Sequence, residues 1–202
     1  EIRPQKPGQE KTETVKMPDR SLEHDYGGIV AGVDEVGRGP WAGPVVAAAV
    51  ILPANLPDKF IDGLDDSKKL SATRRKNLFA GLLSCAEIDI GIGAASVTEI
   101  EQENILCATH IAMGRALGAL TRMPDGALVD GNQLPPNLPC PGRTVIRGDQ
   151  ISLSIAAASI IAKVTRDRIM ASLAVRYPAY RWDRNAGYGT IQHQDGLAAA
   201  GV

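Results

Sequence analysis

Gly28-Ile29-Val30-Ala31-Gly32-Val33-Asp34-Glu35-Val36-Gly37-Arg38-Gly39 is the stretch of this chain that decides its fold. The apolar first half, bounded by glycines, is typical of a buried strand over residues 28–34. Two adjacent carboxylates, Asp34 and Glu35, stand at its end, where burying both charges is costly unless a cation lies beside them. Hard cations such as Mg²⁺ prefer carboxylate oxygens, and the glycines that follow let backbone N–H groups approach a ligand closely. The stretch therefore predicts a strand that ends in a metal-assisted site for phosphate-ester chemistry.

The rest of the sequence alternates strand-like and helix-like segments. A second apolar run over residues 44–52 follows a short glycine turn, which predicts an antiparallel pair with the first strand. We expect three further strands, over residues 88–95, 127–130 and 144–146. Helices are expected over residues 72–85, 98–120, 152–175 and 191–200. This order predicts an α/β fold with a mixed five-stranded sheet flanked by helices and a small C-terminal helical part.

Local signals place the ends of these helices. Ser71 follows a polar turn and predicts an N-cap for the helix at 72–85. Thr98, followed three residues later by Glu101, predicts a capping box, and we expect a break in that helix near Asn104. The helix at 152–175 begins with Ala and Ser, whose small side chains allow a close approach to the sheet.

Length and composition favour one folded domain. The 202 residues, 44% of them hydrophobic, are enough for a substantial core. We expect the polar residues 1–26 to be a flexible extension and residues 27–202 to form the catalytic domain. No apolar stretch approaches the ~20 residues needed to cross a membrane, and none resembles a secretory signal. Three cysteines, odd in number and far apart, predict free thiols, as expected for a cytoplasmic protein.

The net charge of −1 does not by itself indicate nucleic-acid binding, but the charges are distributed asymmetrically. Between residues 85 and 130, seven acidic residues stand against two basic ones. From residue 141 onward, eight basic residues stand against four acidic ones. This asymmetry is compatible with a basic face for phosphates, although solvated helix surfaces are often charged as well.

Two further acids stand where the first pair does. Asp130 ends the strand at 127–130, and Asp149 follows the strand at 144–146. Because groups at strand ends collect at one edge of an α/β sheet, we expect both to meet Asp34 and Glu35 there. Two Mg²⁺ or Mn²⁺ ions roughly 4 Å apart would relieve the repulsion and suit in-line phosphoryl displacement. Each Asp near a Gly could instead be an ordinary turn residue, but chance is a poor explanation for all four.

The same residues carry a resemblance to a known family. Six blocks of sequence, in the family's order, resemble bacterial ribonuclease HII and cover roughly residues 28–202. They are Gly32-Val33-Asp34-Glu35-Val36-Gly37-Arg38-Gly39-Pro40, Asp66-Ser67-Lys68-Lys69-Leu70, Val129-Asp130-Gly131-Asn132, Gly148-Asp149, the segment 154–167 and Gly187-Tyr188-Gly189-Thr190. Any one block is modestly specific, whereas all six together are very specific.

The resemblance implies a ribonuclease H-like fold and an endoribonuclease that hydrolyses the RNA strand of RNA–DNA hybrids. It also implies incision on the 5′ side of a single ribonucleotide embedded in duplex DNA, leaving 3′-hydroxyl and 5′-phosphate ends. It further implies two divalent ions, Mn²⁺ or Mg²⁺, bound together with substrate. The catalytic residues and metal ligands it indicates are Asp34, Glu35, Asp130 and Asp149. These are the acids that the strand ends had already indicated.

The resemblance also indicates how substrate is held. Gly37-Arg38-Gly39 matches a loop that senses the 2′-hydroxyl through backbone groups, a role that suits glycine because a side chain would hold the sugar away. Tyr188 matches a tyrosine that stacks on the deoxyribose beyond the ribonucleotide; without its glycine neighbours it would indicate only a half-buried aromatic. Lys68 and Lys69 resemble positions near the substrate phosphates, or form a solvated pair at a turn.

Other interpretations stay open. The chain could be a non-catalytic RNA–DNA hybrid-binding module with structural acids, which would bind a duplex without cutting it. Ribonuclease HIII has the same reaction class, but 26 polar residues are too few for its added N-terminal domain. Gln150-Ile151 stands where the family often carries a lysine, so we expect one phosphate contact fewer. Nothing suggests a symmetric interface, and we expect a monomer.

Overall fold

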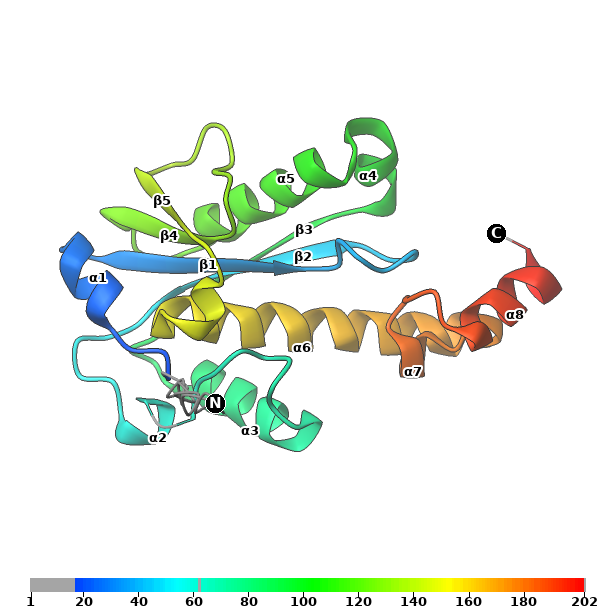
Figure 1. The fold of residues 1–202 in the computed structure, drawn as a ribbon, viewed down its shortest axis with the longest axis horizontal. Coiled ribbons are helices and arrows are strands. Elements are labelled where there is room, and N and C mark those ends of the chain that lie inside the picture. The colour runs from blue at the N-terminus through cyan, green and yellow to red at the C-terminus, as the bar shows by residue number, and fades with distance from the viewer. Residues whose placement is uncertain (1–16, 62, 202) are drawn as a thin grey trace, which may run out of the picture.

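The computed structural model describes residues 17–61 and 63–201, and the five strands in this part of the chain form one sheet (Figure 1). They are β1 (Val30–Val36), β2 (Val45–Ile51), β3 (Asp89–Ala95), β4 (Gly126–Asp130) and β5 (Gly142–Val145). Their order in the sheet is β3-β2-β1-β4-β5. β1 pairs antiparallel with β2 and parallel with β4, so the predicted hairpin and the mixed sheet are both confirmed.

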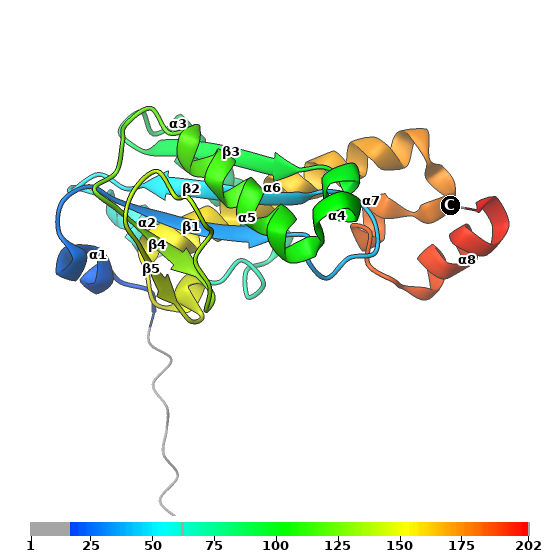
Figure 2. The same cartoon turned by 90° about the horizontal axis from the view of Figure 1, so that it is seen from above.

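Helices cover both faces of this sheet. They are α1 (Ser21–Tyr26), α2 (Asp58–Ile61), α3 (Ala72–Ser84), α4 (Val97–Glu103), α5 (Ile105–Gly118), α6 (Leu153–Arg176), α7 (Trp182–Asn185) and α8 (Ile191–Ala200), with 3-10 turns at Gly148–Gln150 and Pro178–Tyr180. α5 lies on one face and α6 on the other, with α3 packed outside α6 (Figure 1). α8 lies at the end of the molecule opposite α1 and β5 (Figure 2). None of these described helices is both long and apolar enough to cross a membrane.

The strand β2, between β3 and β1, is buried along its whole length, which explains its uninterrupted apolar sequence. Alternate residues of β2 pack with α6 in one core and with α5 in the other. Gly32 of β1 lets α6 lie close to the strand, since a Cβ added at Gly32 would lie 2.2 Å from the carbonyl carbon of Ser154. This contact fixes where α6 begins, and with it the turn that carries Asp149.

The predicted helix ends are confirmed at two places and wrong at a third. Ser71 caps α3 by accepting a hydrogen bond of 3.2 Å from the backbone N–H of Arg74. Asn104, with a φ of 77°, separates α4 from α5. The predicted capping box of Thr98 and Glu101 is wrong.

The capping box lies two residues earlier, at Ser96 and Glu99. The Ser96 hydroxyl accepts a hydrogen bond of 3.2 Å from the Glu99 backbone N–H, and the Glu99 carboxylate accepts one of 2.8 Å from the Ser96 N–H. Because β3 ends at Ala95, the chain turns at once into α4. Thr98 therefore lies inside the first turn of the helix rather than at its cap.

Two strand boundaries also differ from the predictions. β1 continues through Glu35 to Val36, which pairs with Val46 of β2. β5 ends at Val145, and the apolar Ile146 that follows is 70% exposed instead of lying in the sheet. The short helices and 3-10 turns were not predicted, because three or four residues leave no periodic signal.

The predicted flexible extension is wrong for residues 17–26, while residues 1–16 lie outside the described part. Ser21–Tyr26 form α1, and Asp19 makes two backbone hydrogen bonds of 3.0 Å with the segment at the start of α6. Glu23 is buried and accepts hydrogen bonds from Ser152 and Ser154. This polar segment gave no local signal of structure because its partners lie 129 and 131 residues away.

Candidate active site

Asp34 and Asp130 lie side by side at the ends of two parallel strands. β1 and β4 stay paired as far as Val33 and Val129, and the two acids are the next residue on each strand. Asp34 is 6% exposed, on the face that packs against α6. Side chains alternate along a strand, so Glu35 belongs to the face that packs against α5. The site therefore lies where the sheet ends, and both faces contribute a carboxylate.

Asp149 reaches the same strand ends from the turn between β5 and α6. In this turn the backbone N–H of Gly148 donates a hydrogen bond of 2.6 Å to Oδ1 of Asp130. Asp149 is 6% exposed, and burial together with the charges of Asp66 and Asp130 raises its pKa to about 6. Asp149 and Asp130 therefore act on each other, although one lies in this turn and the other at the end of β4.

The other acids of the site also have raised pKa values. Burial, followed by the charges of Glu35 and Asp130, raises the pKa of Asp34 well above its usual range. Burial raises the pKa of Glu35, Arg38 opposes this, and Asp130 adds to it. Burial likewise raises the pKa of Asp130. The protein itself only partly neutralises the negative charge collected here.

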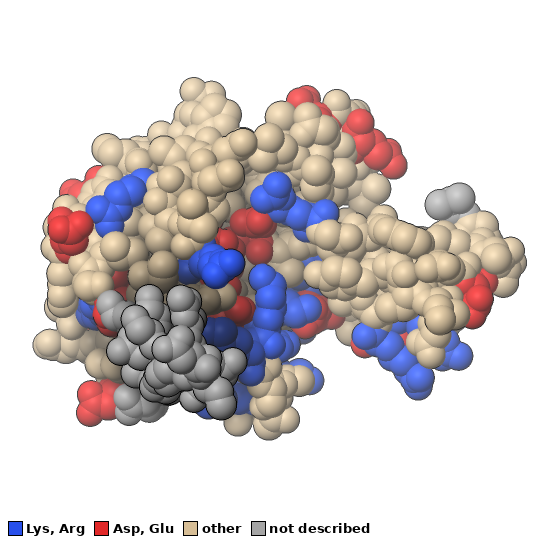
Figure 3. Space-filling model, viewed as in Figure 1, with Lys and Arg blue, Asp and Glu red and all other residues tan. Residues whose placement is uncertain are grey.

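Lys68 faces this group of acids. Burial alone would lower the pKa of Lys68, but nearby carboxylates raise it overall. In order of effect, these carboxylates are Asp149, Asp66, Asp34 and Asp130. The pairing of β1 with β4, and the hydrogen bonds from Gly148 to Asp130 and from Gln150 to Asp66, bring the segments that carry these acids together. On the face of the molecule shown in Figure 3, acidic side chains lie between Lys and Arg side chains.

A fifth carboxylate, Asp66, lies at the site and was not predicted. It is 6% exposed and accepts hydrogen bonds of 2.8 Å from the backbone N–H of Lys68 and 3.4 Å from Nε2 of Gln150. An Asp in a polar turn gives no signal that separates it from an ordinary turn residue. Gln150 thus supports the acidic group through its hydrogen bond to Asp66.

The donor set fits divalent cations. Its oxygens come from carboxylates, the hard ligands that Mg²⁺ and Mn²⁺ take, and a cation would relieve the repulsion behind the raised pKa values. Within residues 17–61 and 63–201, no three His, Cys, Asp or Glu side chains are already gathered around one metal position. Cation binding would therefore have to draw the carboxylates closer together.

Glycine shapes the loop that follows β1. Gly37 has a φ of 113°, and a Cβ there would lie 2.5 Å from the carbonyl oxygen of Pro44. Nη1 of Arg38 lies 3.4 Å from Oε1 of Glu35, which ties the loop to the acids. The loop therefore presents its backbone beside the acidic group, with room that only glycine leaves.

The remaining predicted substrate contacts occupy different surroundings. Tyr188 is 45% exposed and lies next to Gly39, where an added Cβ would be 3.5 Å from the tyrosine ring. Lys69 instead makes a surface ion pair with Asp65 at 3.3 Å, and 41% of its side chain is exposed. The structure thus brings Tyr188 to the glycine loop, whereas Lys69 lies in an ordinary surface pair.

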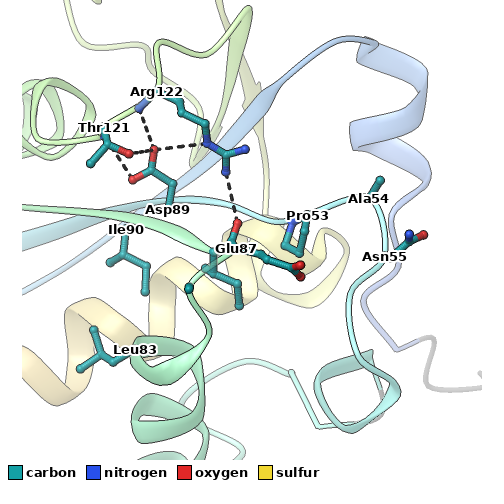
Figure 4. Close-up of a pocket in the computed structure, with 11 residues that line it drawn as sticks. Pro53, Ala54, Asn55, Leu83, Glu87, Asp89, Ile90, Thr121 and Arg122 are labelled. Carbon is teal, nitrogen blue, oxygen red and sulfur yellow. Dashed lines mark hydrogen bonds and ion pairs between the residues drawn. The ribbon is translucent and has the colours of Figure 1, made fainter.

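A cavity of about 790 Å³ lies away from these acids, where β3 begins at Asp89 (Figure 4). The acids lie at the other end of the sheet. Two acids, Glu87 and Asp89, line it. Asp89 accepts hydrogen bonds of 3.1 and 2.9 Å from the backbone and hydroxyl of Thr121 and 2.8 Å from the backbone of Arg122. Burial would raise the pKa of Asp89, but these bonds lower it overall. Asp89 is therefore a well-paired structural anion.

Comparison with known proteins agrees with this geometry. The family model described as Ribonuclease HII matches residues 31–202. The chain belongs to the ribonuclease HII family. Ribonuclease HII of Rhodospirillum rubrum is 60% identical over 187 residues, which cover 92% of this chain and 85% of that protein. The protein of the same description from Granulibacter bethesdensis is 61% identical over 188 residues, covering 93% of this chain and 85% of that protein.

Solved structures show the same fold. Ribonuclease H2 from Pyrococcus horikoshii superposes with a TM-score of 0.67 and 27% identity, covering 82% of each chain. A Bst-RNase HIII in complex with Mn²⁺ has a TM-score of 0.67, with 18% identity, and the match covers 89% of this chain and 73% of that one. At this identity the similarity supports the fold alone. The predicted ribonuclease H-like fold is confirmed. As a ribonuclease HII, the chain is a metal-dependent endoribonuclease that acts on RNA–DNA hybrids.

Proposed function

We propose that this enzyme also incises duplex DNA on the 5′ side of a single embedded ribonucleotide, by a two-metal-ion mechanism. The products are 3′-hydroxyl and 5′-phosphate ends. The proposal is supported by the place of Asp34, Asp130 and Asp149 at one edge of the sheet. Asp34 and Asp130 end two paired strands, and Gly148, next to Asp149, donates a hydrogen bond to Asp130. Glu35 joins them through its action on Asp34.

The four acids would hold two divalent ions, Mn²⁺ or Mg²⁺, when substrate is present. Bound there, the ions would supply an activated water and stabilise the leaving oxygen. The protein's own task is to bring ionised carboxylates from β1, β4 and the 148–150 turn to one phosphodiester. Lys68 supplies a positive charge beside them and offsets part of the charge of the phosphate.

Substrate choice would come from the loop after β1 and from Tyr188. The backbone of Gly37-Arg38-Gly39 can approach a ribose closely, and a 2′-hydroxyl both donates and accepts hydrogen bonds. Tyr188, beside Gly39, would stack on the deoxyribose that follows the ribonucleotide. Together they would select a junction from RNA to DNA.

A labelled DNA duplex with one ribonucleotide tests the proposal. We expect a single incision on the 5′ side with Mg²⁺ or Mn²⁺, none with chelator, and none in a matched all-DNA duplex. Asp34→Asn should lose most turnover and keep its fold, whereas Asp195→Asn, at an exposed position on α8, should behave like the parent. Full activity of Asp34→Asn would refute its role as a metal ligand.

The non-catalytic alternative makes a different prediction for the same assay. A hybrid-binding module would bind the duplex and never cut it with either metal. We further propose that residues 27–202, together with α1, form the catalytic domain, that the enzyme works as a monomer and that it works in the cytoplasm. Light scattering of the purified protein, alone and with duplex, tests the proposed monomer.

A further inference from the structure

Trp41 is a large aromatic side chain that the fold leaves in solvent. It lies in the loop between β1 and β2 and is 63% exposed, and the proposed function does not use it. A single exposed apolar side chain is ordinary on a protein surface. Trp41, however, lies beside the loop of Tyr188, which is 45% exposed. Proteins that bind nucleic acids commonly use exposed aromatic rings to stack on parts of the ligand, and here two such rings lie near a nuclease site.

Hydrogen bonds join the backbone of Trp41 to the loop that carries Tyr188. The N–H of Trp41 donates a bond of 2.9 Å to the carbonyl oxygen of Gly187, and the N–H of Ala42 donates one of 3.3 Å to the same oxygen. A Cβ at Gly187 would lie 2.4 Å from the carbonyl oxygen of Ala42. The two loops, far apart in sequence, therefore pack backbone against backbone.

Arg166 of α6 holds the Trp41 loop and the Tyr188 loop together from inside the protein. Its side chain is fully buried and donates hydrogen bonds of 2.9 Å to the carbonyl of Pro44, 2.8 Å to that of Ala42 and 2.7 Å to that of Ala186. These carbonyls flank Trp41 on one side and Tyr188 on the other. Because the loops are held in place by the fold, little further ordering is needed when a ligand arrives.

The indole of Trp41 rests on Gly189. A Cβ added at Gly189 would lie 2.3 Å from Cε2 and 2.4 Å from Cζ2 of the indole, so glycine leaves the space that the ring occupies. The ring centroid of Trp41 lies 6.1 Å from that of His193, which is 1% exposed and accepts a hydrogen bond of 3.1 Å from Trp182. The indole thus has a rigid support on one side and solvent on the other.

We propose that Trp41 is a substrate-binding residue whose indole packs against the sugars of the nucleic-acid duplex next to the sugar that Tyr188 contacts. This inference rests on the proposed function. The ligand class follows from position, since Trp41 lies two residues beyond Gly39 in the loop that adjoins the acids. Sugars are the accessible apolar surface, because the bases of a paired duplex are stacked on one another. Trp41 therefore adds affinity and takes no part in the chemistry.

Steady-state cleavage of the single-ribonucleotide duplex tests this role. Trp41→Ala should raise KM roughly tenfold, as expected for the loss of one stacked ring, and leave kcat within about twofold. Trp41→Phe should restore most of the loss. Gly189→Ala, which displaces the indole without removing it, should raise KM in the same direction. Met123→Ala, at a residue that is 69% exposed near the cavity at the other end of β3, is the matched control. An unchanged KM in Trp41→Ala overturns the inference.

Fluorescence separates this inference from the proposed function. The chain has two tryptophans, so Trp182→Phe leaves Trp41 as the sole tryptophan, whose emission is excited selectively on the long-wavelength side of tyrosine absorption. Adding the ribonucleotide duplex in chelator should shift that emission and reduce its quenching by acrylamide. If the parent never cuts the duplex, the proposed function fails, and the emission still reports whether Trp41 meets nucleic acid. If the parent cuts and neither emission nor KM responds, the inference about Trp41 fails alone.

Discussion

The backbone N–H of Gly148 donates a hydrogen bond of 2.6 Å to Oδ1 of Asp130. This bond ties the end of β4 to the turn that carries Asp149, so the acid at the strand end and the acid in the turn keep a fixed relation. A hydrogen bond to the ionised form lowers the pKa of a carboxyl, and here it opposes the effect of burial on Asp130. Gly148 thus helps Asp130 to remain charged in a site that already collects negative charge.

Asp130→Asn should abolish most of the activity. The amide keeps the size of the side chain and an oxygen acceptor but loses the charge, and losing one such electrostatic group costs roughly 10²–10³-fold in kcat. Single-turnover cleavage of an RNA–DNA hybrid measures the loss. A thermal melt should show a folded protein, and Asp183→Asn, at an exposed position, should match the parent. Turnover within a few-fold of the parent would contradict a role for Asp130 at the reacting centre.

Without metal, the folded protein should lose stability as the pH rises from about 4 to about 6. The pKa of Asp149 is about 6 in the fold, against a usual value of 3.8. Between these values the folded state holds a proton that the unfolded chain has released, so raising the pH favours unfolding. The loss is at most ~3 kcal/mol and is complete above the folded pKa. The raised pKa values of Asp34 and Glu35 act in the same direction.

Urea unfolding in chelator at pH 4.5 and 7.5 measures this dependence. Asp149→Asn should flatten it, and its difference from the parent isolates the contribution of Asp149. Millimolar Mn²⁺ or Mg²⁺ should stabilise the parent at pH 7.5, because the folded state binds the cation better than the unfolded chain does. A parent whose pH dependence is the same as that of Asp149→Asn would be incompatible with a raised pKa.

Lys68 and Lys69 should differ sharply when replaced by alanine. Lys68 responds to the carboxylates of the site, whereas Lys69 pairs with Asp65 on the surface. We expect Lys68→Ala to lower kcat/KM about tenfold or more, since it removes a partly desolvated charge near the phosphate. Lys69→Ala should stay within about twofold, because exposed ion pairs contribute little. Equal losses in the two variants would show that Lys69 also meets substrate.

Glu23→Ala should destabilise the fold. One oxygen of Glu23 accepts hydrogen bonds of 2.6 Å from the hydroxyl of Ser152, and 2.9 and 2.6 Å from the N–H and hydroxyl of Ser154. Removing the carboxylate leaves these buried donors without a hydrogen-bond acceptor, which should lower the free energy of unfolding by about 3 kcal/mol. Urea midpoints measure the effect, and Glu101→Ala, exposed on α4, is the control. An unchanged midpoint for Glu23→Ala would mean that water replaces the carboxylate without loss.

A residue of the site could be predicted where the neighbouring residues in the sequence indicate its position in the fold. Asp34 and Asp130 follow apolar runs, so their place at strand ends could be predicted. Asp66 lies in a turn, where Asp is common, and only its burial beside Asp149 separates it from an ordinary turn residue. The predicted capping box at Thr98 was wrong because the position of the cap depends on where β3 ends. β3 ends at Ala95, so the helix is capped by the next residue, Ser96.

The sequence by itself determined the order of the strands and the longer helices, the acids at the strand ends, the glycine loop and the membership of a nuclease family. These features follow from patterns within a few residues, because backbone geometry and side-chain size set the local structure that each pattern can adopt. Only the tertiary structure decided that Glu23 anchors α6, that Lys68 and not Lys69 faces the acids, and that Trp41 stands exposed on Gly189. Burial and charge act between segments far apart in sequence, so their effects exist only once the chain has folded.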